Sequence, residues 1–200
     1  MSIESRLKQM GVTLPRLAGP FGAYVPARRS GGQVYVSGQL PMRDGKLVAV
    51  GQVPTRCSIE QAREAAAQCV LNALAAVQAM GIALDALAGV VRVGVFVSSA
   101  PTLTQQPQVA NAASELLVEL FGEPGRHARS AVGVASLPLD ATVEIEFVFE
   151  LAGPDSGLAS LHRPLTPAWP AGVAGSNADV FGVVAVDPGA AGGCHDGSSK

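Results

Sequence analysis

Hydrophobic positions recur at helical spacing in three segments of the chain. In residues 59–80, Ala62, Ala65, Cys69, Ala73 and Val77 fall on one face, which predicts a long amphipathic helix. Ser58 precedes this segment and Gln61 follows three positions later, the spacing of a capping box. The same periodicity predicts a second helix over residues 109–121 and a short one over residues 2–10.

Other segments alternate between apolar and polar residues, the period of a half-buried strand. Residues 33–40 (QVYVSGQL) and 141–151 (ATVEIEFVFEL) alternate clearly, and residues 90–97 (VVRVGVFV) are rich in β-branched side chains. Weaker patterns predict strands over residues 24–29, 47–53 and 130–135. The order is three strands, a helix, a strand, a helix and two strands, which indicates an α+β domain with one sheet and both long helices on a single face. The other sheet face then needs cover, and self-association would supply it.

The composition changes near residue 153. We expect one domain over residues 1–152, with the short helix at residues 2–10 and the core at residues 22–152. Residues 153–200 are rich in Gly, Ala, Pro and Ser, which predicts a low-complexity, disordered tail. Within this tail, residues 180–186 (VFGVVAV) have the alternative of docking as a strand.

Charge and rare residues narrow the function. The formal net charge is −2 and aromatic residues make up 4% of the 200 residues, which argues against a nucleic-acid partner. The three cysteines fit no CxxC pattern and the three histidines are scattered, so we expect no metal site and a reducing cytoplasm. Residues 65–84 lack charges, but Gln68, Asn72 and Gln78 favour a buried amphipathic helix over a membrane span.

Four residues are candidates for chemistry on local pattern alone. Arg129 opens a strand of small residues, and its guanidinium needs a carboxylate partner, either Glu144 or Glu146 of this chain or a bound ligand; the local pattern favours the internal ion pair. Glu144 and Glu146 lie two apart in one strand and so share a face, which is either solvated or able to orient a water molecule. Tyr24 is a core or edge residue that also offers a hydroxyl.

Four segments together resemble a known family. They are GAYVPA from Gly22, VYVSGQLP from Val34, the helix VLNALAAV that contains Asn72, and HARSAVGVASLPLDATVEIE from His127. Their order and spacing are similar to those of the RidA-type enamine/imine deaminases, also called the YjgF or L-PSP endoribonuclease-like family. The chain resembles a divergent branch with GRHARSAVGVASLP.

The resemblance implies a chorismate-mutase-like fold, a homotrimer and clefts between subunits. In it, Arg129 matches the arginine that binds the substrate carboxylate, and Glu144 matches the acidic residue near the attacking water. Tyr24 matches the cleft tyrosine, and Gly38 matches a glycine whose backbone faces the substrate. No metal or organic cofactor is implied.

The activity that this resemblance implies is hydrolysis of small 2-aminoacrylate-like enamines and 2-imino acids to 2-keto acids and ammonia. The alternatives are a non-catalytic trimer that binds small carboxylates and, as one family name suggests, a ribonuclease. The chain departs from the family pattern at His127, which replaces a proline, at Ala131, which replaces a cysteine in some members, and at Ser114, which lies roughly where an asparagine is common. We place His127 in a solvated loop, and these changes leave the preferred substrate open.

Overall fold

The computed structural model describes residues 1–16 and 23–153. The described elements are α1 Ile3–Gln9, β1 Ala27–Ser30, β2 Gln33–Gln39, β3 Met42–Arg43, β4 Lys46–Leu47, α2 Ile59–Ala79, η1 Leu84–Ala86, β5 Leu87–Ser98, α3 Gln106–Phe121, η2 Glu123–Gly125, β6 Ala128–Val134, η3 Pro138–Asp140 and β7 Val143–Leu151. The predicted tail, including residues 180–186 with their alternative of docking as a strand, lies outside the described residues, apart from Gly153.

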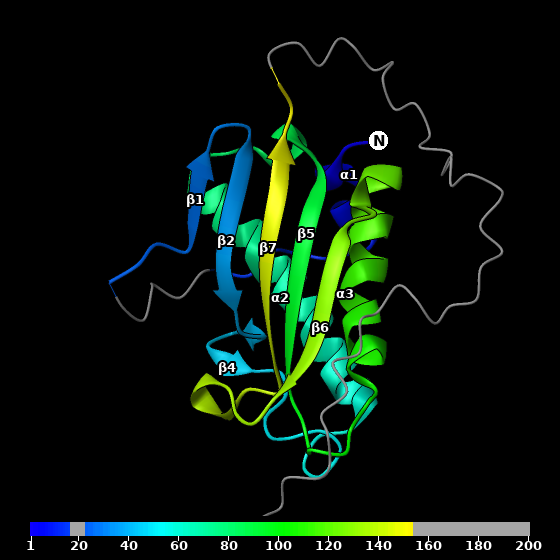
Figure 1. Cartoon of the computed structure of the whole chain (residues 1–200). Helices are drawn as coiled ribbons and strands as arrows, with labels where there is room; N and C mark the ends of the chain where they lie inside the picture. The colour runs from blue at the N-terminus through cyan, green and yellow to red at the C-terminus, as the bar shows by residue number, and fades with distance from the viewer. Residues whose placement is uncertain (17–22, 154–200) are drawn as a thin grey trace, which may run out of the picture. The chain divides into compact units, whose positions relative to one another are not determined.

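Five strands form one mixed sheet in the order β1-β2-β7-β5-β6. Neighbouring strands are antiparallel except for β5 and β6, which run parallel. Helices α2 and α3 pack on each other and cover one face of the sheet, and β6 forms the edge beside α3 (Figure 1). The predicted α+β class, with a sheet backed by two long helices, is confirmed.

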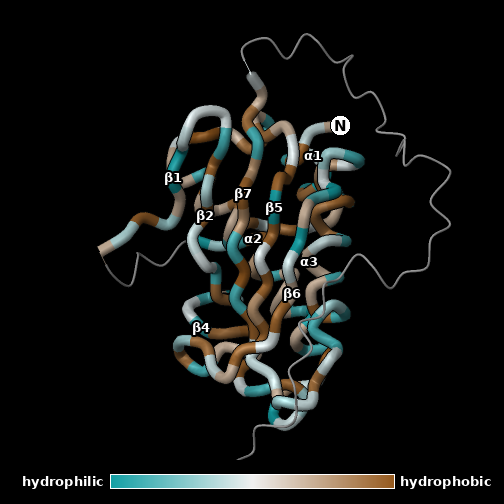
Figure 2. Tube along the Cα trace, in the orientation of Figure 1, coloured by the Kyte–Doolittle hydropathy of each residue, from teal (hydrophilic) through white to brown (hydrophobic). Residues whose placement is uncertain are grey.

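The core lies between this sheet and the helices. Val143, Ile145, Phe147 and Phe149 alternate along β7 and are all buried toward the helices, whereas the glutamates between them face the other side. Figure 2 shows the same alternation of apolar and polar positions along the central strands. On α2, the predicted apolar stripe is buried and the Ser58–Gln61 capping box is formed.

Two strand predictions need correction. The first strand begins at Ala27, so Tyr24 precedes it in a bend rather than opening it. The segment 47–53 is no continuous strand: it contains Leu47, the last residue of the short β4, and two isolated bridges, at Val50 and Val53. Gly51 lies between these bridges with φ +91°, a conformation that breaks an extended backbone and that glycine adopts without strain.

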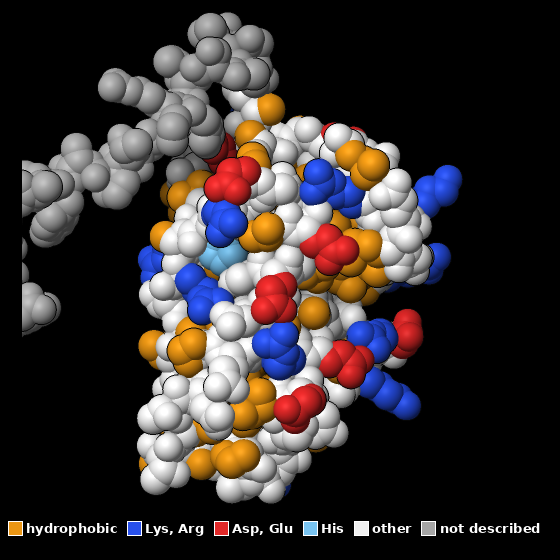
Figure 3. Space-filling view, turned by 90° about the vertical axis from the view of Figure 1, so that its right-hand side faces the viewer, with side chains coloured by type: hydrophobic (Ala, Val, Ile, Leu, Met, Phe, Trp, Pro, Cys, Tyr) orange, Lys and Arg blue, Asp and Glu red, His pale blue; other side chains and the backbone are white. Residues whose placement is uncertain are grey.

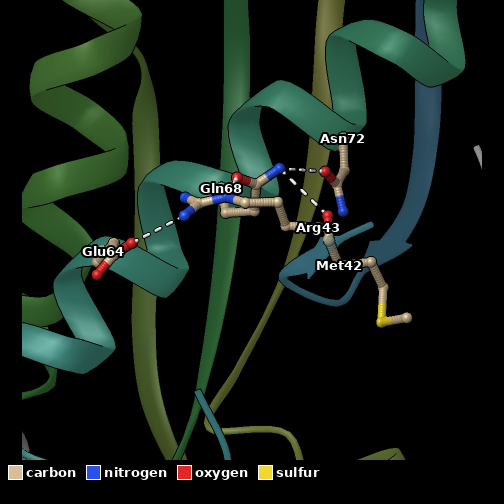
Figure 4. A network of polar contacts seen from close by, with 5 residues as sticks. All are labelled: Met42, Arg43, Glu64, Gln68 and Asn72. Atoms are coloured by element: carbon tan, nitrogen blue, oxygen red, sulfur yellow. Dashed lines mark hydrogen bonds and ion pairs between the residues drawn. The ribbon is translucent and has the colours of Figure 1, made fainter. Parts of the chain in front are cut away.

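Two buried polar residues of α2 hold the loop that leaves β2. Asn72 Nδ2 donates to the Leu40 carbonyl at 2.8 Å, and Gln68 Nε2 donates to the Met42 carbonyl at 3.2 Å and to Asn72 Oδ1 at 2.9 Å. Arg43 donates to Gln68 and pairs with Glu64 (Figure 4). Because no buried side-chain polar atom among the described residues lacks a hydrogen-bond partner, the helix tolerates two buried amides and fixes the C-terminal end of β2.

None of the described helices combines the length and the apolar character that a membrane crossing requires. The uncharged stretch in α2 is instead packed in the core, where Ala65, Ala66, Cys69 and Val70 are completely buried. Burial raises the pKa of the Cys69 thiol well above its usual range, so this cysteine is a packed core residue, as the helical pattern predicts.

Candidate functional site

Arg129 lies on the edge strand β6 and points toward α3. In the sheet register it pairs with the buried Val93, so both side chains start on the helix-covered face. The NH1 group donates to Asn111 Oδ1 at 3.0 Å and to Ser114 Oγ at 2.9 Å. Asn111 and Ser114 are three residues apart on α3, the spacing that places two side chains on one helix face.

Arg129 has no carboxylate partner among the described residues, where four other arginines form ion pairs. The expected ion pair with Glu144 or Glu146 is wrong for a topological reason. Strand β6 pairs with β5 rather than with β7, and both glutamates lie on the face of the sheet away from the helices. Within residues 1–16 and 23–153, only NH1 of Arg129 is hydrogen-bonded, so Nε and NH2 remain as a donor fork on an exposed side chain.

His127 contacts the same serine hydroxyl as this arginine. Its Nδ1 is 2.7 Å from the Gly125 carbonyl, and its Nε2 is 3.1 Å from Ser114 Oγ. Burial, and to a smaller extent the charge of Arg129, lowers the pKa of His127, although the hydrogen bond to Gly125 opposes the shift. His127 lies in the loop between η2 and β6, as predicted, but the prediction that it is solvated is wrong: the ring is half-buried and hydrogen-bonded at both nitrogens.

Glu144 and Gly38 lie against each other on the open face of the sheet. Strand β2 carries an irregularity between Val36 and Gln39, so Gly38 is displaced toward the Glu144 side chain of β7. A Cβ atom at Gly38 would overlap the Glu144 carboxylate. Burial, and secondarily the charge of Glu146, raises the pKa of Glu144. Glu144 is thus a half-buried carboxylate packed against the backbone of β2, a group that can act as a general base when ionised.

Tyr24 lines a groove of ≈ 690 Å³ on the same open face. Tyr35, Arg92, Gly94 and Glu146 also line this groove, and a Cβ at Gly94 would be 2.6 Å from Glu146 Oε1. Half of the Tyr24 surface is exposed (50%). An aromatic ring that is half exposed beside a groove offers a surface for a ligand or for another chain.

The structure brings the predicted residues together in two groups. Glu144 lies with Gly38, and Tyr24 lies beside the neighbouring groove, all on the open face. Arg129 is separate from them, at the α3 edge and on the other face of the sheet. Sequence reasoning missed Asn111 as a partner of Arg129 and placed the family's amide at Ser114; the structure supplies an amide from Asn111, one helical turn earlier.

In the part of the chain that is described, no group of three His, Cys, Asp or Glu side chains could hold a metal ion. The candidate groups of the two sets are the Arg129 guanidinium, the Glu144 carboxylate with its raised pKa, the Gly38 backbone and the Tyr24 phenol.

Comparison with known proteins identifies the fold family. Residues 4–151 match the family described as "YjgF/chorismate mutase-like, putative endoribonuclease". Protein TCP17 of Trypanosoma cruzi is 42% identical over 150 residues, which cover 74% of this chain and 94% of that protein. A 2-iminobutanoate/2-iminopropanoate deaminase of Dermatophagoides farinae is 32% identical over 139 residues, 68% of this chain and 92% of that protein.

A solved structure agrees with this assignment. The crystal structure of a protein of unknown function from Agrobacterium tumefaciens is 44% identical, with a TM-score of 0.68, and the match covers 74% of this chain and 91% of that one. The chain therefore belongs to the YjgF/chorismate-mutase-like family, the RidA-type family that its sequence motifs resemble.

Proposed function

We propose that this protein hydrolyses small 2-imino acids and their enamine tautomers to 2-keto acids and ammonia, in clefts between the subunits of a homotrimer. The observation that carries the proposal is the state of Arg129. Its NH1 group is held by two neutral acceptors, while Nε and NH2 are left without a partner among the described residues. This fork matches a carboxylate in a bidentate geometry, and every 2-imino acid carries one.

The remaining groups of the site are suited to adding water to the C=N bond of the substrate. The C=N carbon of an imino acid is electrophilic, so a catalyst has to hold the carboxylate and position one water molecule. Glu144 would take a proton from that water as its oxygen bonds to the C=N carbon. The proton would pass to nitrogen and give a carbinolamine. Glu144 would then carry the proton of the new hydroxyl to the nitrogen, so that the C=O bond forms as the C–N bond breaks and ammonia leaves. A carboxylate with a raised pKa is suited to this exchange of protons.

Gly38 would contribute by its lack of a side chain. The Glu144 carboxylate occupies the space where a Cβ of residue 38 would lie, so it can pack directly against the backbone of β2. Tyr24 would close the cleft from the β1 side, and its hydroxyl would hydrogen-bond the departing nitrogen. No step requires a metal or an organic cofactor.

The two halves of this site favour a cleft between copies of the chain. Arg129 belongs to the α3 edge, whereas Glu144, Gly38 and Tyr24 belong to the open face. Tyr24, Val25, Tyr35 and Val132 are exposed, Tyr35 and Val132 on that open sheet face and Tyr24 and Val25 beside it, which supplies apolar surface for an interface. In a closed ring each copy would present its α3 edge to the open face of the next, so every cleft would receive both halves.

The deaminase of Dermatophagoides farinae supports the substrate class, since the match covers 92% of that protein. We also place the activity in the cytoplasm, because Cys57 and Cys69 are free thiols, as a reducing compartment favours. Ribonuclease activity finds less support. On the side formed by α3, basic and acidic side chains are interspersed (Figure 3), whereas RNA binding requires a concentrated positive surface.

A coupled assay tests the proposal. A pyridoxal-phosphate-dependent serine or threonine dehydratase generates the imine in situ, and keto-acid release is followed with and without the purified protein. The protein should accelerate release, and Arg129→Ala should abolish the effect. Arg126→Ala is the matched control, because it also removes an exposed arginine. Arg126 follows η2 directly and pairs with Glu123. Equal rates for wild type and Arg129→Ala would refute the catalytic assignment, and carboxylate binding without turnover would favour the non-catalytic alternative.

A further inference from the structure

A directed chain of hydrogen bonds runs from Arg129 into the protein. Arg129 NH1 donates to Ser114 Oγ at 2.9 Å, and Ser114 Oγ lies 3.1 Å from His127 Nε2. His127 Nδ1 lies 2.7 Å from the Gly125 carbonyl. The residues come from α3, from the end of η2 and from β6, so the chain ties three elements together behind the guanidinium.

The direction of each bond follows from the chemistry of its two ends. A carbonyl oxygen only accepts, so His127 Nδ1 carries a hydrogen. In the neutral ring Nε2 is then an acceptor, and the Ser114 hydroxyl donates its hydrogen to it. Ser114 Oγ is thereby left with its lone pairs toward Arg129, which is the orientation that an NH1 donor needs.

We propose that Ser114 and His127 are positioning residues, which hold the Arg129 guanidinium with its Nε–NH2 edge turned outward for a carboxylate. Together with Asn111, Ser114 occupies both hydrogens of NH1, so the guanidinium plane cannot rotate without breaking two bonds. His127 fixes the serine hydroxyl that makes one of these bonds. This proposal rests on the proposed function only where it assigns a carboxylate to the outward edge.

The groups around His127 favour its neutral form, which can accept the hydrogen bond from Ser114. Burial and, among the described residues, the charge of Arg129 hold the pKa of His127 below the ordinary value. The facing residues of α3, Asn111 and Ser114, are neutral. On η2, Glu123 is paired with Arg126; elsewhere on α3, Glu115 is paired with Arg63. Arg92 of β5 lies on the opposite sheet face.

Nuclear magnetic resonance of the full-length protein tests the chain of bonds without any substrate. His127→Gln identifies the ring signals. The neutral ring should carry its hydrogen on Nδ1, and Ser114→Ala should raise the pKa of His127, because the hydroxyl that stabilises the neutral form is gone. Asn111→Ala is the matched control: it removes the other acceptor of NH1 but makes no contact with the ring, so it should leave this pKa in place. A neutral ring protonated on Nε2, or a pKa that Ser114→Ala does not move, would overturn the proposal.

Kinetics test the positioning role. Ser114→Ala and His127→Leu should each raise KM for the imine about five- to tenfold with little change in kcat, and the double variant should be no worse than either single one. His127→Gln should restore KM to within about twofold, because its amide oxygen can accept from Ser114. A fall in kcat at constant KM would indicate loss of folded protein and overturn the positioning role, as would multiplying effects in the double variant. If the wild type shows no turnover, the proposed function fails, and the magnetic resonance result alone decides whether the chain of bonds exists.

Discussion

Gly38 of β2 lies so close to the Glu144 carboxylate of β7 that no side chain fits between them. The irregular pairing of β2 with β7 creates this proximity, because two residues of β2, Ser37 and Gly38, are accommodated opposite one residue of β7. The space beside the Gly38 backbone is therefore filled by the Glu144 carboxylate, and a side chain placed there should affect catalysis more than folding.

Gly38→Ala should lower kcat for imine hydrolysis about tenfold or more, because the methyl group displaces the carboxylate from its position. The thermal unfolding midpoint should change little, since Gly38 has no positive φ and an alanine adopts the same backbone. Gly32→Ala is the matched control: it is also a glycine beside β2, and a Cβ there meets nothing within 4 Å. Normal kcat in Gly38→Ala would show that the Glu144 position is not critical.

Glu144 should set the acid limb of the pH profile. As a general base it acts only when ionised, and its raised pKa shifts the fall in kcat/KM to a higher pH than for an ordinary glutamate. Glu146→Gln removes the like charge that contributes to this shift, so the acid limb should move to lower pH. An acid limb that Glu146→Gln leaves in place would argue against Glu144 as the titrating base.

Glu144→Gln should lower kcat about 100-fold or more, the usual contribution of a general base. The same change should raise the thermal midpoint at neutral pH. A carboxylate whose pKa is raised by folding destabilises the folded state at pH values above that pKa, and glutamine removes the charge. Unfolding followed by circular dichroism at pH 7 and near pH 4 checks the sign, because the gain should shrink at the lower pH, where Glu144 is protonated.

The sequence predicts the layers of this fold well because they follow from periodicity. The apolar stripe of α2 and the alternation along β7 are each visible in one segment, and the structure confirms both. The resemblance also identified Gly38 and Glu144, which the structure brings together. The segment 47–53 was mispredicted because its valines suit a strand, while the conformation of Gly51 divides it.

The surroundings of Arg129 could not be predicted in the same way. Local pattern suggested Glu144 or Glu146 as its partner, but strand order decides which face and which neighbour an arginine has, and order is a property of the whole sheet. The burial of His127 in its loop could not be predicted, because nothing near it in sequence indicates Ser114, which lies 13 positions away on α3. The one available signal was the spacing of Asn111 and Ser114, two polar residues on one face of a mostly apolar helix.

Asn72 should be important for stability. Asn72→Ala removes the donor to the Leu40 carbonyl and one of the two acceptors of Gln68 Nε2, which should cost about 1–3 kcal/mol of unfolding free energy. Urea denaturation measures the loss. Gln78→Ala is the control, since Gln78 is an exposed residue of the same helix. A midpoint shift no larger than that of Gln78→Ala would mean that water replaces the amide without loss.

Mixed oligomers test whether the two half-sites come from different subunits. Arg129→Ala and Glu144→Gln should each be inactive alone. When the two variants are unfolded together and refolded at equal amounts, some clefts receive the intact arginine from one variant and the intact glutamate from the other. Random assembly makes this about one cleft in four, so about a quarter of wild-type activity should return. A site contained within one chain predicts no recovery, because every copy then carries a defect. Mixing Arg129→Ala with wild type provides the reference for dilution, and light scattering on the same samples measures whether the assembly is a trimer.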